Sequence, residues 1–277
     1  MAIKGIVLDI DGTLLTNEKV ISEKTKQALI NAQKNGVKVI LASGRPTTGM
    51  YGYAKELAMD QFEGLLVSFN GASVVDCQTD AELFNQALSV ANAKEVLEHM
   101  KQFDVRPMIN KDEYMYVNNV YDNVLELPDG PFNIIEYESR GGNFKLCEID
   151  DLAAFVDFPL NKILIAADAA YLQEHHQAMA APFENRLSAM FTAPFYFEFT
   201  DKGIDKAKAL DTVLPQFGLQ AEELIAFGDG HNDASIIEYA GIGVAMENAV
   251  DALKEIADEI TLSNNEDGIA VLLEKYL

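Results

Sequence analysis

Residues 5–15 constrain the fold more than any other stretch of the chain, because a short apolar run ends there in two aspartates. The run has the length of a buried β-strand, and Asp9, Asp11, Gly12 and Thr13 follow it. Two carboxylates at the end of a buried strand cost free energy unless a cation or a reaction uses them. A strand ending in an acidic turn would account for a single Asp-Gly pair, but it is a weak account of the complete string. The string therefore predicts a functional site at the carboxyl end of a first strand.

Short apolar segments alternate with amphipathic helical segments near both ends of the chain. Strands are expected over residues 3–9, 37–42, 65–69, 224–227 and 243–245. Between the first three we expect helices over residues 22–35 and 47–58, the first with Ser22 as its N-cap and Gly36 just beyond its end. This alternation is typical of βαβ units in a parallel sheet. Ligands bind at the carboxyl ends of such strands, so residues distant in sequence should meet at that edge.

The middle of the chain has a different pattern. Residues 106–110 and 113–118 resemble a hairpin, further strands are expected over 162–166, 187–191 and 195–199, and helices near 91–102 and 170–181. Glycine and proline gather over residues 128–142, which predicts a loop. We therefore predict that residues 84–190 form a separate α+β module. It would be inserted into an α/β domain made of residues 1–83 and 191–277.

Composition and charge limit the possible partners. The chain has 277 residues, enough for one large or two modest domains, and a net charge of −23. That charge argues against nucleic acid or an anionic membrane surface as a partner. No signal peptide or transmembrane helix is expected, and the sequence predicts no particular oligomeric state. Cys77 and Cys147 form neither a CxxC pair nor a disulfide framework, which indicates reduced thiols in a cytoplasmic protein.

Four motifs together resemble the haloacid dehalogenase (HAD) superfamily, whose members are mostly phosphatases. In the family's order they are Asp9-x-Asp11-Gly-Thr, Ser43-Gly44, Lys206, and Gly-Asp229-Gly-His-Asn232-Asp233. The resemblance of the catalytic core covers roughly residues 1–83 and 190–277. The sequence is most similar to the Cof-type sugar-phosphatase branch, because Asn70-Gly71-Ala72 follows a strand and Asp267-Gly268 precedes a last helix. The resemblance implies a Rossmann-like parallel-sheet α/β core with a large inserted α+β cap of the C2 type.

The first motif supplies the two catalytic residues that the resemblance implies. Asp9 would be the nucleophile, because an ionised carboxylate can form an aspartyl-phosphate that water then hydrolyses. Asp11 would protonate the departing alkoxide and then activate the hydrolytic water. That role requires a carboxyl that stays partly protonated near neutral pH, which crowding by neighbouring carboxylates favours. Gly12 and Thr13 are expected to shape the turn and hold Asp11 in place.

The same resemblance assigns a set of phosphate-binding residues: Ile10, Ser43, Gly44, Lys206 and Asn232. Lys206 lies at the start of a helix, where a cation opposes the macrodipole, so a functional role for its charge is indicated. Family members commonly have glycine after this lysine, whereas this chain has Ala207, and two other lysines, at positions 202 and 208, lie nearby. Arg45 is either a structural ion-pair residue or a substrate contact. We assign no chemistry to His231.

A magnesium ion is the cofactor that the resemblance implies. Its ligands would be Asp9, the backbone carbonyl of Asp11, Asp229 and Asp233, the last directly or through a water molecule. If Asp9, Asp229 and Asp233 are ionised and Asp11 is protonated, the site carries three negative charges. One Mg²⁺ and Lys206 neutralise them before a phosphate dianion arrives, so the divalent cation is expected to be required.

The order and spacing of the motifs narrow the expected function. One helix and one strand fill the interval from Asp9 to Ser43, whereas the interval from Ser43 to Lys206 holds a large cap. Dehalogenases lack the second aspartate, so Asp11 indicates an oxygen leaving group. We therefore expect a Mg²⁺-dependent phosphatase of small phosphomonoesters, with sugar phosphates first among them. A phosphomannomutase-like phosphotransferase and a non-catalytic phosphate-binding protein are the alternatives.

Overall fold

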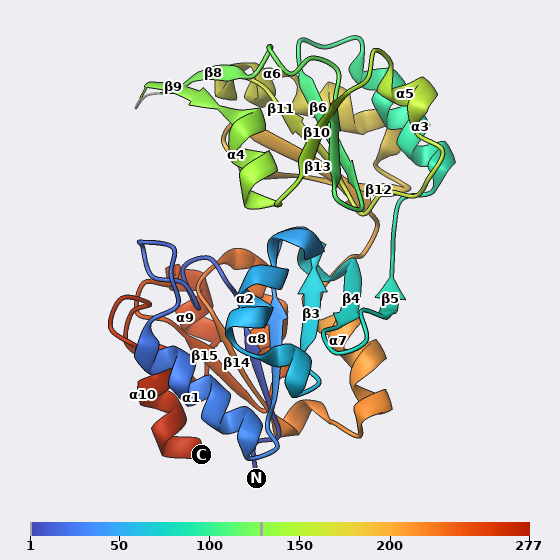
Figure 1. Cartoon of the computed structure of the whole chain (residues 1–277). Coiled ribbons are helices and arrows are strands. Elements are labelled where there is room, and N and C mark those ends of the chain that lie inside the picture. Colours follow the sequence, from blue (N-terminus) through green and yellow to red (C-terminus); the bar gives the residue numbers. More distant parts are fainter. Residues whose placement is uncertain (1, 128–129) are drawn as a thin grey trace. The chain divides into compact units, whose positions relative to one another are not determined.

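The computed structural model describes residues 2–127 and 130–277, which fold into two compact units. Met1–Asn85 and Ile204–Leu277 form the first unit, and Gln86–Gly203 form the second (Figure 1). The first unit is therefore made of the two ends of the chain, and the second is an insertion between them. This is the organisation that the sequence predicts.

The first unit is built on one large sheet. Among the described residues its strand order is β16-β15-β14-β1-β2-β3-β4-β5. The strands are β1 (Gly5–Leu8), β2 (Lys38–Ala42), β3 (Leu65–Ser68), β4 (Ser73–Asp76), β5 (Glu82–Asn85), β14 (Leu224–Gly228), β15 (Ile242–Ala245) and β16 (Glu259–Ile260). Strands β16 to β3 pair in parallel, while β4 and β5 are added antiparallel. The expected parallel α/β sheet is confirmed.

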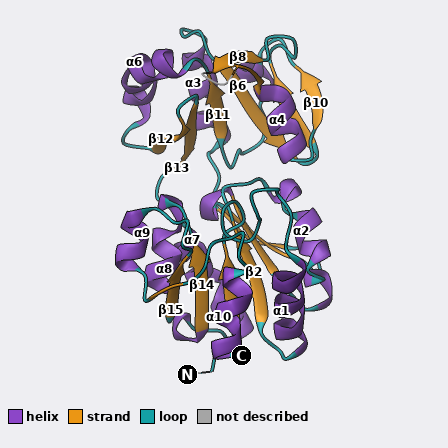
Figure 2. Ribbon diagram, turned by 90° about the vertical axis from the view of Figure 1, so that its left-hand side faces the viewer, coloured by secondary structure: helices purple, strands orange, loops and turns teal. Residues whose placement is uncertain are grey.

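Helices cover both faces of this sheet. They are α1 (Glu23–Lys34), α2 (Tyr51–Glu56), α7 (Lys206–Val213), α8 (Ala234–Tyr239), α9 (Asp251–Ile256) and α10 (Gly268–Tyr276). Figure 2 shows α7, α8 and α9 on one side and α1 and α2 on the other, with α10 packed against α1. Ser22 caps α1 by accepting a hydrogen bond from the backbone N–H of Thr25 at 3.2 Å, as expected. The helix expected over residues 47–58 is shorter, because Thr47–Gly49 form a 3₁₀ turn before α2.

The second unit contains a mixed sheet with the order β10-β7-β6-β11-β13-β12 and a separate hairpin of β8 and β9. Its strands are β6 (Arg106–Lys111), β7 (Tyr114–Val117), β8 (Val124–Leu127), β9 (Gly130–Asn133), β10 (Lys145–Glu148), β11 (Ile163–Ala166), β12 (Leu187–Ala193) and β13 (Tyr196–Asp201). Its helices are α3 (Val90–Met100), α4 (Ile134–Gly141), α5 (Leu152–Phe155) and α6 (Ala169–Ala180). Alternate side chains of β11 enter two separate apolar clusters, so both faces of the sheet are packed.

Two expectations for the insertion need correction. The insertion does not end at residue 190, because β12 and β13 pair antiparallel and Phe197 and Phe199 pack into its core. The loop expected over residues 128–142 is largely ordered as β9 and α4, since the Asn133 side chain caps α4 and Ile134 and Ile135 are buried. Residues 128 and 129 of that expected loop lie outside the described residues.

No helix in the described part of the chain combines the length and the apolar character needed to cross a membrane.

Candidate active site

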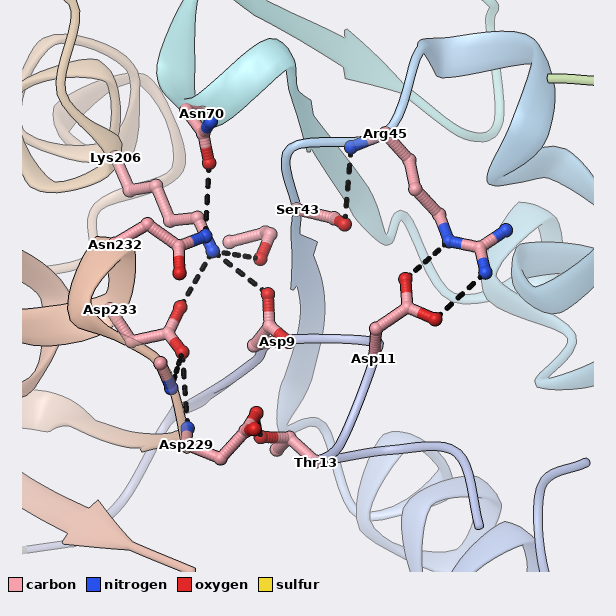
Figure 3. A network of polar contacts seen from close by, with 12 residues as sticks. Asp9, Asp11, Thr13, Ser43, Arg45, Asn70, Lys206, Asp229, Asn232 and Asp233 are labelled. Carbon is pink, nitrogen blue, oxygen red and sulfur yellow. Dashed lines mark hydrogen bonds and ion pairs between the residues drawn. The ribbon is translucent and has the colours of Figure 1, made fainter. Parts of the chain in front are cut away.

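Four neighbouring strands of the first unit end in polar residues that meet at one edge of the sheet. Asp9 follows β1, Ser43 follows β2, Asp229 follows β14, and Asn70 lies just beyond β3. Figure 3 shows their side chains directed toward one another, with Lys206 reaching in from the start of α7. The convergence that the parallel sheet predicts is therefore present.

Lys206 is the centre of this cluster. Its side chain is 1% exposed, and Nζ donates to Asp9 Oδ1 at 2.9 Å, to Asp233 Oδ1 at 2.6 Å and to the backbone carbonyl of Ala42 at 2.8 Å. Burial alone would lower the pKa of Lys206, but the charges of Asp9 and Asp233 raise it to about 12. Lys206 is therefore a fixed cation. The two nearby lysines, at positions 202 and 208, are exposed, and Lys202 Nζ donates to the backbone carbonyl of Glu184 at 3.2 Å.

Asp9 is buried beside this cation. The pKa of Asp9 is raised to about 8: burial contributes most to the rise, the charge of Lys206 opposes it, and the charges of Asp233 and Asp229 add to it. Its Oδ1 faces Lys206. Among the described residues, no donor lies on its Oδ2. One oxygen of this carboxylate is therefore positioned by the lysine, and the other is available to a ligand.

Asp229 and Asp233 complete the carboxylate cluster. Asp233 Oδ2 accepts hydrogen bonds from the backbone N–H groups of Asp229 at 3.1 Å and Gly230 at 2.9 Å, so both of its oxygens are engaged. Asp229 Oδ1 accepts a hydrogen bond from the Thr13 hydroxyl at 2.8 Å. Burial raises the pKa of Asp229 to about 6, although the Thr13 bond opposes this rise.

Gly12 allows this close packing of the first motif against Asp229. It has a φ of +88°, and a Cβ at this position would lie 2.3 Å from Asp229 Oδ2. Thr13 was expected to hold Asp11, but its hydroxyl holds Asp229 instead. The Gly-Thr pair therefore joins the first motif to the fourth across the sheet edge.

Asp11 points away from the carboxylate cluster. Arg45 donates to both of its oxygens, from Nε at 2.6 Å and from Nη2 at 2.9 Å (Figure 3). Lys19 Nζ lies 3.0 Å from Oδ1. Burial alone would raise the pKa of Asp11, but the hydrogen bonds and charges of Arg45 and Lys19 lower it. The expectation of a partly protonated Asp11 is therefore wrong for this arrangement, because its neighbours are cations rather than carboxylates. Of the two readings of Arg45, the structure shows the ion pair.

The remaining expected residues line the same edge. Ser43 is buried, and its hydroxyl accepts a hydrogen bond from the backbone N–H of Arg45 at 3.3 Å. Asn232 is exposed and donates from Nδ2 to Asn70 Oδ1 at 3.1 Å. Gly44 lies against the Asn70 amide, whereas the Ile10 side chain is buried in the core. His231 is exposed at the start of its 3₁₀ turn.

Sequence analysis assigned no role in the site to two residues of this edge, Asn70 and Lys19. Asn70 was visible only as part of an Asn-Gly pair after a strand, and its contact with Asn232 joins residues far apart in the chain. Lys19 reaches Asp11 from a turn in which it has a positive φ of 61°. The Asn-Gly pair was the only available signal for Asn70, and nothing in the sequence singled out Lys19.

The carboxylates form a set that fits a hard divalent cation. One oxygen each from Asp9, Asp229 and Asp233 lie within 4.8 Å of one another. Carboxylate oxygens are the donors that Mg²⁺ prefers. Burial first, and the charges of neighbouring carboxylates after it, raise the pKa values of Asp9 and Asp229, and a bound cation would oppose both causes. The donor set and its excess of negative charge therefore both suit Mg²⁺.

Comparisons with known proteins agree with this architecture. Residues 6–273 match the family model of haloacid dehalogenase-like hydrolases. The chain is 30% identical to the 5-amino-6-(5-phospho-D-ribitylamino)uracil phosphatase YitU of Bacillus subtilis, covering 98% of this chain and 96% of that protein. It is 26% identical to the pyridoxal phosphate phosphatase YbhA of Escherichia coli, over the full length of both.

A solved structure extends this likeness to the whole fold. The chain is 32% identical to a haloacid dehalogenase-like hydrolase from Bacteroides thetaiotaomicron, with a TM-score of 0.91 over 99% of this chain and 100% of that chain. The family model spans nearly all of both units, and the structural match includes the insertion. The chain belongs to the haloacid dehalogenase-like hydrolases.

Proposed function

We propose that this protein is a Mg²⁺-dependent phosphatase that hydrolyses small phosphomonoesters, sugar phosphates among them, through an aspartyl-phosphate on Asp9. The observation that carries the proposal is the buried Lys206, which holds Asp9 beside two further aspartates. A structural ion pair needs one acid for one lysine. The additional carboxylates are costly to bury unless a cation and a phosphate use them.

Asp9 is proposed to attack phosphorus with the oxygen that Lys206 does not hold. The new bond joins Asp9 Oδ2 to phosphorus, and the bond between phosphorus and the substrate's alkoxide oxygen breaks. Water then attacks the same phosphorus, which frees inorganic phosphate and restores the Asp9 carboxylate. Lys206 stabilises negative charge on the phosphoryl oxygens in both steps.

Asp11 is proposed to protonate the leaving alkoxide and to take a proton from the attacking water. In the structure it accepts hydrogen bonds from Arg45 and Lys19, which lower its pKa. Asp11 therefore has to leave this double ion pair before it can carry a proton to the substrate. Arg45 is proposed to position Asp11 rather than to bind the phosphate.

Mg²⁺ is proposed to bind Asp9, Asp229 and the backbone carbonyl of Asp11. Both oxygens of Asp233 already accept hydrogen bonds, which supports a role for Asp233 in orienting Lys206 and the Asp229 loop. The cation would neutralise the carboxylates and polarise the phosphate. Ser43, Gly44, Asn232 and the backbone of Ile10 are proposed to bind the phosphoryl oxygens.

The inserted unit is proposed to select the alcohol that carries the phosphate. All four motifs lie outside Gln86–Gly203. The two relatives named above act on a ribitylamino-uracil phosphate and on pyridoxal phosphate, whose alcohols share little chemistry. This difference supports a common phosphate site combined with a variable element that contacts the rest of the substrate.

Replacing Gln86–Gly203 with a short Gly-Ser linker tests this assignment. A variant that circular dichroism shows to be folded should keep some activity on a small activated ester. It should lose its preference among phosphorylated sugars, nucleotides and cofactors. A folded variant with the preferences of the full chain would contradict a role of the insertion in specificity.

Phosphate release from p-nitrophenyl phosphate, with Mg²⁺ and with EDTA, tests the reaction. We expect turnover with Mg²⁺ and none with EDTA. Binding of phosphate without turnover would instead identify a non-catalytic phosphate-binding protein. With hexose phosphates, release of inorganic phosphate supports the phosphatase, whereas formation of an isomeric sugar phosphate would identify a phosphomannomutase-like transferase.

A further inference from the structure

Three consecutive residues beyond β3 have left-handed backbone conformations. Phe69, Asn70 and Gly71 have φ values of 52°, 56° and 102°. Asparagine and glycine tolerate this region, but a bulky residue such as Phe69 rarely adopts it. Strained backbone of this kind persists only where the surrounding structure enforces it, and it gathers at functional sites.

The surrounding structure does enforce this conformation. The backbone N–H groups of Phe69 and Asn70 donate to the carbonyls of Arg45 at 3.0 Å and Ser43 at 2.9 Å. On the other side, a Cβ at Gly71 would lie 2.3 Å from the backbone carbonyl of Asp205, immediately before Lys206. The segment is therefore wedged between the loop of the second motif and the start of α7.

The strain fixes where the Asn70 amide lies. Asn232 donates to Asn70 Oδ1 at 3.1 Å (Figure 3), so Nδ2 occupies the other branch of the amide. The whole amide lies over Gly44, where an added Cβ would be 3.1 Å from Nδ2 and 3.2 Å from Oδ1. Among the residues that the structure describes, no acceptor lies on Nδ2, and Asn70 is only half-buried. A donor is therefore presented at the edge where Ser43, Gly44 and Asn232 meet.

We propose that Asn70 is a ligand of the substrate phosphate, donating from Nδ2 to a phosphoryl oxygen. This inference rests on the proposed function and adds a residue to its phosphate site. An Asn-Gly pair also occurs in ordinary turns. The decisive feature is the position of the Asn70 amide. Asn232 of the fourth motif donates to it, and it lies over Gly44 of the second motif.

Two substitutions separate the side chain from the backbone. Asn70→Gly keeps the left-handed conformation and removes the amide, whereas Asn70→Asp keeps the shape and replaces the donor by an acceptor. Asn143→Gly is the matched control, because Asn143 has a φ of 54° and lies exposed in the second unit. Thermal melting confirms that each variant is folded.

Calorimetric titration of inorganic phosphate in the presence of Mg²⁺ measures the effect without turnover. A hydrogen bond to a charged group predicts that Asn70→Gly weakens phosphate binding about ten- to a hundredfold, with at least as large a loss for Asn70→Asp. Asn143→Gly should bind as the wild type does. Wild-type affinity in a folded Asn70→Gly would overturn the inference and leave the proposed function standing. A wild-type protein that neither binds phosphate nor hydrolyses an ester would overturn both.

A double-mutant cycle with Asn232→Ala tests whether Asn70 acts only through Asn232. If both amides contact the phosphate, Asn70→Gly should still weaken binding by about tenfold in the Asn232→Ala background. No further loss in that background would show that Asn70 merely orients its neighbour, and the inference would be wrong.

Discussion

Each unit of the molecule pairs a lysine with a buried carboxylate, and the two clusters differ in how the acids are arranged. In the second unit, Lys162 Nζ donates to Glu198 Oε2 at 3.0 Å, and their side chains are 15% and 5% exposed. In the first unit, Lys206 holds Asp9 and Asp233 while Asp229 lies in the same group of carboxylates. Burial opposes the charge of Lys162, but Glu198 and Glu138 raise its pKa above its usual value.

The difference shows what distinguishes a reactive cluster from a structural ion pair. In the second unit, Glu198 is ion-paired with Lys162, and the charge of Glu138 acts on the same lysine. Around Lys206, burial and mutual repulsion raise the pKa values of Asp9 and Asp229, and each keeps an oxygen to which no described residue donates. The proposed cation and phosphate would therefore bind carboxylate oxygens of the first unit, whereas Lys162 and Glu198 satisfy each other through their ion pair.

Removing the Asp9 carboxylate should have the largest effect. Asp9→Asn is nearly isosteric and keeps a polar group near Lys206, but an amide cannot attack phosphorus. We expect turnover to fall below about one percent of the wild-type rate, as loss of a nucleophile does. Glu198→Gln, the matched change beside the other lysine, should leave the rate per folded molecule nearly unchanged. Phosphate release measures both, and a higher residual rate for Asp9→Asn would exclude it as the nucleophile.

Magnesium should discriminate between the two clusters by stabilising only the first. A cation that binds the folded state stabilises it by RT ln(1 + c/Kd), where c is the cation concentration. The melting temperature therefore rises with the logarithm of that concentration once it exceeds Kd. We expect Mg²⁺ to raise the melting temperature of the wild type and of Glu198→Gln, but not of Asp229→Asn. Differential scanning calorimetry with and without EDTA measures the shift. A full shift in Asp229→Asn would remove this residue from the metal site.

The sequence was sufficient to predict those strands that a short run of neighbouring residues marks. Apolar runs of strand length marked β1, β2, β3 and β14, and parallel pairing then brought Asp9, Ser43 and Asp229 to one edge. The end of the insertion was placed too early, because nothing near residue 190 shows that β12 pairs with β13. The Gly and Pro cluster was read as a loop, although Asn133 caps α4 immediately after β9.

The partners of the site residues were predicted less well than the residues themselves. Thr13 was expected to hold its close neighbour Asp11, but it bonds Asp229 more than two hundred positions away. Asp11 was expected among carboxylates, yet its bonded neighbours are Arg45 and Lys19. Side-chain direction at the end of a strand depends on the loops that converge there, and no local pattern encodes that geometry.

Removing the charge of each lysine should affect different properties: stability alone for Lys162, and the reaction rate as well for Lys206. Lys162→Met leaves Glu198 buried without a partner, which typically costs about 3–5 kcal/mol of stability. Replacing both members, as in Lys162→Met with Glu198→Leu, should recover most of that loss. Urea unfolding followed by circular dichroism measures these changes.

Lys206→Met should also destabilise the fold, because it leaves Asp9 and Asp233 buried without their cation, but unlike Lys162→Met it should act on the reaction as well. We expect the rate per folded molecule to fall by about a hundredfold or more, as removal of one charge-stabilising group does. Lys162→Met should keep a rate close to that of the wild type on an activated ester. Equal losses of rate in the two variants would contradict the division into a reactive and a structural cluster.

Thr13 offers the finest test, because its hydroxyl touches the reactive cluster only through Asp229. Thr13→Val has nearly the same shape and removes the 2.8 Å hydrogen bond to Asp229 Oδ1. Partners that orient a metal ligand typically contribute about ten- to a hundredfold in metal affinity, and we expect the lower figure here.

Thr13→Ser, which keeps the hydroxyl, should bind Mg²⁺ nearly as the wild type does. Thr47→Val is the matched control, since Thr47 bonds Ser68 and contacts no carboxylate of the cluster. Calorimetric titration with Mg²⁺ decides the matter: equal affinities for Thr13→Val and Thr47→Val would mean that Asp229 is oriented without Thr13.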